Sequence, residues 1–222
     1  MEKLFTVASS PHAHQKQNVQ SIMRDVVIAL IPAFLVGTYL FGLKALWTTL
    51  ICVLSCVAFE AIWQKFTHQK VTITDLSAVV TGMLLAFNLP ADIPIYVPIV
   101  GSFVAIILAK QMFGGIGQNF INPALAARAF LLTAYPTAMT NFQKPERFIG
   151  SAPVTNWDAT SAASAVDTLS SATPLVAFKL GDSSYMPSLM DAFLGNIGGC
   201  LGEVCALALL LGGLYLISVS YT

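Results

Sequence analysis

Charged side chains are scarce in this sequence, and their scarcity excludes most soluble proteins. Only 10% of the 222 residues are Asp, Glu, Lys or Arg, whereas 56% are hydrophobic and the mean hydropathy is +0.74. Ordinary globular domains carry about 25% charged residues. The eleven basic and eleven acidic residues cancel, so the net charge favours neither nucleic acid nor an acidic substrate as a partner. The composition predicts an all-α polytopic membrane protein.

The sequence also lacks a cysteine pattern typical of disulfides or metal sites. Cys52 and Cys56 fall in one apolar stretch, Cys200 and Cys205 fall in another, and no Cys-x-x-Cys spacing occurs. We therefore expect free, buried cysteines that act as small hydrophobic residues. The polar segment 1–25 lacks the apolar core and cleavage site of a signal peptide, so we expect it to be retained as a cytoplasmic N-terminal segment.

Six membrane segments are predicted, two of them short or interrupted. A bilayer core needs about 20 residues of apolar helix. The segment 76–89 is shorter and ends at Asn88-Leu89-Pro90-Ala91-Asp92, and 112–135 becomes apolar only after Asn122-Pro123, so half of it is expected to be irregular backbone at membrane depth. The predicted segments are 26–43, 45–63, 76–89, 93–109, 112–135 and 193–219.

Basic residues in the short loops predict the orientation. If the spans alternate, one face receives Lys3, Lys16, Arg24, Lys65, Lys70 and Lys110, whereas Lys44 and Asp92 fall on the other. Basic residues are outnumbered by acidic ones in the loop 136–192. We therefore predict a cytoplasmic N-terminus, membrane helices within 26–135, an extracytoplasmic loop 136–192 and a further membrane helix in 193–222.

A hydroxyl nucleophile stands among small residues in that loop, in the run Asp167-Thr168-Leu169-Ser170-Ser171-Ala172-Thr173. The pattern Asp-x-x-Ser-x-Ala-Thr resembles the flavin-attachment motif of the RnfD/NqrB family, the related membrane subunits of the Rnf complex and of the sodium-pumping NADH:quinone reductase. The family usually has glycine at the position of Ser171, and serine keeps that position small. By itself, a serine-rich loop is also typical of turns and helix caps.

The resemblance implies that FMN is esterified to Thr173 through its phosphate. A flavin transferase working outside the membrane would install it, with Asp167, Ser170 and Ala172 as parts of the attachment motif that guide this enzyme. The predicted extracytoplasmic position of the loop agrees with that requirement. No catalytic acid–base pair or nucleophile set is visible in the sequence, so Thr173 is expected to tether the cofactor.

A second motif, Gly114-Gly115-Ile116-Gly117-Gln118-Asn119-Phe120-Ile121-Asn122-Pro123-Ala124, combines glycines that permit close backbone approach with two asparagines. Asparagine amides both donate and accept hydrogen bonds, as the edge of a flavin ring requires. This stretch resembles a family hallmark associated with non-covalent riboflavin. The resemblance makes Asn119, Asn122, Gly114 and Gly115 its candidate ligands. A glycine-rich bend capped by Asn and Pro for structural reasons remains the alternative.

Ionisable residues within apolar segments are candidates for an ion pathway, because a charge in hydrocarbon costs several kcal/mol unless it is paired or hydrated. Glu203 falls within the last predicted span beside Gly198, Gly199 and Gly202. It is predicted either to line an ion path or to make an interhelical hydrogen bond. Arg128 is predicted to pair with Glu203, to contact a flavin or phosphate, or to line a polar crevice. Glu60, close to Lys65, is expected at the membrane interface.

The short N-terminal segment with Ser9-Ser10-Pro11-His12 resembles the RnfD branch of the family. The resemblance implies an electron-carrying subunit of an ion-translocating ferredoxin:NAD oxidoreductase in a prokaryotic cell membrane, with Na⁺ or H⁺ as the coupling ion. The implied partners are other Rnf subunits, the flavin transferase and membrane lipid. The His-x-His at 12 and 14 offers too few ligands for a metal site.

Two alternatives stay open: the equivalent NqrB protein of the quinone reductase, and a non-redox channel or carrier for small solutes. Members of the family usually continue for several more spans, so the chain resembles the first half of a urea-channel-like inverted-repeat fold plus one helix. It is either a natural short form or a fragment.

Overall fold

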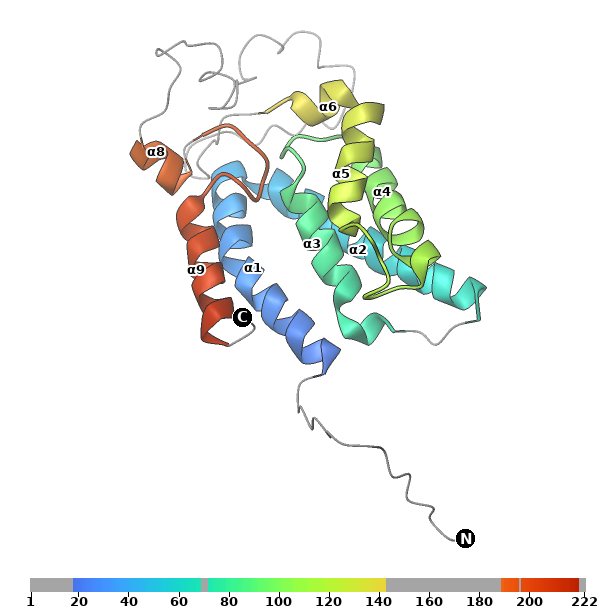
Figure 1. The fold of residues 1–222 in the computed structure, drawn as a ribbon. Helices are drawn as coiled ribbons and strands as arrows, with labels where there is room; N and C mark the ends of the chain where they lie inside the picture. The colour runs from blue at the N-terminus through green and yellow to red at the C-terminus, as the bar shows by residue number, and fades with distance from the viewer. Residues whose placement is uncertain (1–17, 69–71, 143–188, 196, 220–222) are drawn as a thin grey trace, which may run out of the picture.

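The computed structural model describes residues 18–68, 72–142, 189–195 and 197–219. In those ranges all regular structure is helical (Figure 1), as the composition predicts. The longer helices are α1 (Val19–Phe41), α2 (Leu43–Phe66), α3 (Ser77–Phe87), α4 (Tyr96–Phe103), α5 (Pro123–Ala134) and α9 (Ala206–Ser218). The shorter ones are the 3₁₀ turn η1 (Ile73–Asp75), the π-helical turn η2 (Val104–Leu108), the 3₁₀ turn η3 (Gln111–Phe113), α6 (Pro136–Thr140) and α8 (Leu189–Leu194).

Within the described ranges, three helical segments are long and apolar enough to cross a bilayer: Val19–Phe41, Leu43–Phe66 and Tyr96–Phe113, the last formed by α4 and its continuation. The other apolar helices, α3, α5 and α9, have 11, 12 and 13 residues. At about 1.5 Å per residue they reach about 17–20 Å, less than the roughly 30 Å of hydrocarbon in a bilayer. The chain is therefore a multi-pass membrane protein with half helices, as predicted.

The helices pack around α2 and α3 (Figure 1). The α1–α2 hairpin turns at Gly42, whose φ is 72°. Helices α3 and α4 both pack along α2, α5 lies against α3, α4 and η2, and α9 lies beside α1. The largest buried cluster joins α2, α3, α4 and α5, and its fully buried side chains include Cys52, Leu85, Leu89, Val97, Ala127 and Leu131.

Two predicted interruptions are present. Helix α3 ends at Phe87 and α4 begins at Tyr96, so the chain breaks across the Asn88–Asp92 stretch. Helix α5 begins at Pro123, and the residues between η3 and Pro123 are not helical. Both breaks follow local chemistry, since proline cannot continue a helix and glycine lowers its stability.

The last predicted segment, 193–219, differs from one continuous span. Helix α8 ends at Leu194 and α9 begins only at Ala206. The described residues between them are irregular and lie against α3, because Leu201 N donates to Leu89 O at 3.1 Å and Gly202 N to Phe87 O at 3.0 Å. These backbone hydrogen bonds replace the intrahelical bonds that a continuous span would make. The four cysteines are free and buried, as expected.

Candidate functional site: a glycine loop and two polar clusters

The residues of the attachment motif, Asp167, Ser170, Ala172 and Thr173, lie outside the residues that the structure describes. Their roles stay predictions. The candidate residues of the second motif, and Arg128, Glu203 and Glu60, all lie in described segments. These residues form three distinct arrangements.

The glycine loop, residues 114–122, joins η3 to α5. All three of its glycines have positive φ: 105° at Gly114, 95° at Gly115 and 80° at Gly117. A Cβ added at Gly115 or Gly117 would meet nothing within 4 Å, so backbone conformation, and not crowding, requires glycine there. Across the loop, the rings of Phe113 and Phe120 meet edge to face at 4.9 Å. The loop thus leaves open space beside an exposed backbone.

The two asparagines of this loop differ in what they bind. The Oδ1 of Asn122 accepts a hydrogen bond from Ala124 N at 3.0 Å, which makes Asn122 the N-cap of α5 with Pro123 at the first helical position. The Oδ1 of Asn119 is buried and has no hydrogen-bond partner. A buried acceptor without a partner costs free energy and indicates a missing donor. Asn119 therefore has a buried acceptor without a partner, whereas the oxygen of Asn122 caps the helix.

Arg128 and Glu203 come close to each other without forming an ion pair. Arg128 Nη1 donates to Asn88 Oδ1 at 2.6 Å, and Glu203 Oε1 accepts from Cys200 N at 3.0 Å. Both side chains also interact with the Cys200 thiol. This outer cluster, formed by Asn88, Arg128, Cys200 and Glu203, joins the end of α3, the middle of α5 and the irregular segment before α9.

Close backbone contact brings Glu203 to this position. A Cβ on Gly202 would collide with the Phe87 side chain at the end of α3, and a Cβ on Gly199 would lie 2.9 Å from Glu203 Oε1. The glycines near Glu203 therefore allow tight packing, but of an irregular segment and not of a helix. The side chain of Glu203 is exposed on this chain.

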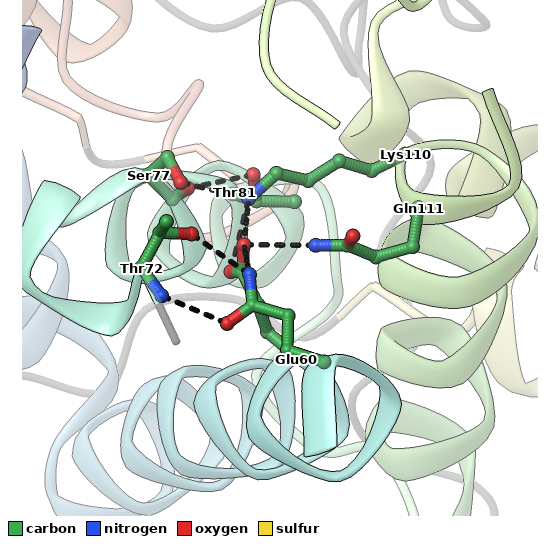
Figure 2. Close-up of polar contacts among 7 residues, drawn as sticks. Glu60, Thr72, Ser77, Thr81, Lys110 and Gln111 are labelled. Carbon is green, nitrogen blue, oxygen red and sulfur yellow. Dashed lines mark hydrogen bonds and ion pairs between the residues drawn. The ribbon is translucent and has the colours of Figure 1, made fainter. Parts of the chain in front are cut away.

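Glu60, which is expected at the membrane interface, is buried inside the helix bundle. It is 1% exposed, and Lys110 Nζ donates to both of its oxygens, at 2.8 Å to Oε1 and 2.9 Å to Oε2. Lys110 is itself 3% exposed and also donates to Ser77 Oγ at 2.7 Å. Figure 2 shows these side chains converging from α2, α3 and the end of the α4 segment. Lys110, 50 positions away in the sequence, thus meets Glu60 inside the helix bundle, whereas the depth of Glu60 in the membrane stays a prediction.

We call this group the inner cluster, and two amides complete it. It consists of Glu60, Gln64, Ser77, Lys110 and Gln111. Gln111 Nε2 donates to Glu60 Oε1 at 2.9 Å, and Gln64 Nε2 approaches the same oxygen at 3.4 Å and donates to Thr72 Oγ1 at 2.8 Å. Sequence reasoning missed this group of residues. One signal pointed to it: Gln64 lies four residues after Glu60, hence on the same face of α2, whereas Lys65 does not.

A third polar contact marks the opposite end of α2. Lys44 Nζ lies 2.8 Å from Asp92 Oδ1, and both side chains are about 40% exposed, at 42% and 41%. Lys44 and Glu60 are 16 residues apart on one helix, or about 24 Å along its axis. The two ion pairs therefore lie at opposite ends of α2, in agreement with the alternation of spans assumed from the sequence.

Comparison with known proteins gives consistent matches. The model of the NQR2, RnfD, RnfE family matches residues 6–222. The chain is 51% identical over 215 residues to the D subunit of the Na⁺-translocating ferredoxin:NAD⁺ oxidoreductase complex of Acetobacterium woodii, covering 96% of this chain and 62% of that protein. It is 38% identical over 228 residues to the D subunit of the proton-translocating ferredoxin:NAD⁺ oxidoreductase complex of Clostridium ljungdahlii, covering 99% and 64%. The chain thus spans less than two thirds of the length of these relatives.

Proposed function

The chain belongs to the NQR2, RnfD, RnfE family, and on that premise we propose that it carries electrons as the RnfD component of an ion-translocating ferredoxin:NAD oxidoreductase. The observation that carries the proposal is the 51% identity over 96% of the chain to the Acetobacterium woodii protein. The other subunits of such a complex are its proposed partners, together with membrane lipid and a flavin transferase during maturation.

The proposed covalent cofactor is FMN on the hydroxyl of Thr173. The support is the motif from Asp167 to Thr173 in a polar loop that follows the described membrane helices. We propose that this loop is extracytoplasmic and that the N-terminus is cytoplasmic, since the basic residues of the short loops favour that orientation. A bound flavin supplies the redox chemistry, and the protein holds and orients it.

The proposed second cofactor is non-covalent riboflavin at the glycine loop. The loop fits such a ligand in two respects: Gly115 and Gly117 leave open space, and Asn119 Oδ1 is a buried acceptor without a partner. An N–H group at the edge of a ligand ring would satisfy that oxygen. Asn122 contributes indirectly, because its cap fixes the start of α5 and so the end of the loop.

Ion movement is proposed to involve the outer cluster. Glu203 and Arg128 carry opposite charges and interact with the same thiol without forming an ion pair with each other. Glu203 thus remains able to attract a cation, while Asn88 holds Arg128 in place. The coupling ion is Na⁺ or H⁺, and the two relatives named above differ in that respect.

In-gel fluorescence of the denatured protein tests the proposal. The purified wild-type chain is expected to show a flavin band after denaturing electrophoresis, and Thr173→Ala is expected to lose it. Thr168→Ala, in the same run of residues, is the matched control and should keep the band. A wild-type protein without flavin would instead favour a channel or carrier for small solutes.

A further inference from the structure

The inner cluster contains a buried ion pair that the proposed electron transfer does not use. Among the ion pairs between described residues, Glu60–Lys110 alone has both side chains buried, at 2% and 3% exposure. Such a pair is weak evidence for stability, because the cost of desolvation offsets much of its attraction. In a membrane protein, charged groups inside the bundle commonly mark paths for substrates and ions.

The ligands of the Lys110 ammonium are those that a metal cation would take. Its three contacts are all oxygens: both carboxylate oxygens of Glu60 and the hydroxyl of Ser77, at 2.7–2.9 Å. Carboxylate and neutral oxygens are the usual ligands of hard cations. We propose that Glu60 and Ser77 form a binding site for a monovalent metal cation such as Na⁺, which the Lys110 ammonium occupies in the state seen here.

Charge balance requires an exchange at this site. If the ammonium leaves, Glu60 keeps only the two amide donors of Gln111 and Gln64. These amides hold the carboxylate in place but carry no net charge, and an uncompensated buried carboxylate costs several kcal/mol. A positive charge, either a metal cation or a proton, must therefore reach Glu60 as the lysine departs, and the site we propose takes the metal cation. Departure is feasible because a lysine near a helix end can extend its four-carbon stem to the membrane surface.

The backbone on both sides of the cluster departs from regular helix. Lys110 follows the π-helical turn η2 and precedes the 3₁₀ turn η3, and such irregular helical turns often accompany functional sites or hinges. Ser77 follows Leu76, which has a φ of 59°, a conformation that a bulky residue rarely adopts. Lys110 itself and one of its two partners thus lie next to irregular backbone.

The site also connects to the glycine loop. The Lys110 carbonyl accepts a hydrogen bond from Gly115 N at 3.1 Å. Movement of Lys110 would therefore shift the glycine loop, which links occupancy of the cation site to the proposed flavin site.

Thermal unfolding of the purified full chain in lipid nanodiscs tests the site. The midpoint temperature of unfolding is measured in NaCl and in choline chloride at equal ionic strength. The proteins compared are wild type, Lys110→Met and the control Glu60→Gln/Lys110→Met. Lys110→Met is expected to be stabilised by Na⁺ and not by choline. For Lys110→Met, Na⁺ at 100 times its Kd should raise the ratio of folded to unfolded protein about 100-fold. The control, without either charge, should not respond, and wild type should need more Na⁺ because the lysine competes.

Three results would overturn the proposal. Lys110→Met and the control would respond equally to Na⁺, or Lys110→Met would fail to fold in either salt. The third is that low pH, and not Na⁺, stabilises Lys110→Met. The inference rests on the proposed ion-translocating function but is tested without electron transfer. In-gel flavin fluorescence on the same samples separates the two. A Na⁺ response in a protein without flavin would reject the redox role and keep the cation site.

Discussion

Substituting the two asparagines of the glycine loop should have opposite consequences. Asn122→Ala removes the 3.0 Å hydrogen bond from Ala124 N to the cap of α5. Loss of an Asn N-cap costs about 1 kcal/mol, within roughly 0.5–2 kcal/mol. Asn122→Ser is the matched control, since serine is an equally good cap, and its free energy of unfolding should stay near that of wild type.

Asn119→Ala should not destabilise the protein from which the non-covalent flavin has been removed. The Oδ1 of Asn119 is buried without a partner, and leaving such an acceptor unsatisfied costs about 1–3 kcal/mol. Its removal is therefore expected to leave the free energy of unfolding unchanged or to increase it. The same substitution should lower the content of non-covalent flavin severalfold, because the ligand loses the acceptor that we assign to it.

Two assays on each variant separate these roles: denaturant unfolding of the flavin-free protein in micelles, and fluorescence of the flavin released by acid from a Thr173→Ala background. The expected pattern is loss of stability in Asn122→Ala and loss of released flavin in Asn119→Ala, with neither in Asn122→Ser. If Asn119→Ala unfolded more easily than Asn122→Ala and kept its flavin, the assignment of the two side chains would be refuted.

Three further substitutions and one control test other contacts. Lys44→Met removes an exposed ion pair and should cost less than about 1 kcal/mol, a loss that shrinks further at high salt in denaturant titrations. Gly202→Val drives a side chain into Phe87 and should lower stability by about 1–3 kcal/mol in thermal unfolding, whereas Gly213→Ala, whose Cβ meets nothing within 4 Å, should not. In the assembled complex, Glu203→Gln should slow ion transport severalfold at unchanged flavin content; equal transport would reject a role for Glu203.

Local signals predicted much of the fold. Hydropathy predicted the α1–α2 hairpin, Pro90 and Asp92 marked the break after α3, and Asn122-Pro123 marked the start of α5. Each of these features depends on residues close in sequence. Proline, glycine and capping side chains act within one helical turn, so the sequence alone is sufficient.

Long-range pairing was not predictable in the same way. Lys65 is nearer to Glu60 in sequence, but five residues place it about 140° around the helix. The actual partner, Lys110, is brought to Glu60 by the packing of α2 against the α4 segment. The irregular segment before α9 also depends on distant residues, because its backbone hydrogen bonds go to Phe87 and Leu89.

Intact-mass measurement of the chain purified from its native membrane tests the central claim most directly. A phosphate-linked FMN on Thr173 adds about 440 Da to the mass of the polypeptide, and the addition should be absent from Thr173→Ala. An unmodified wild-type chain within an active complex, or the same added mass in Thr173→Ala, would contradict the claim that this residue carries the flavin.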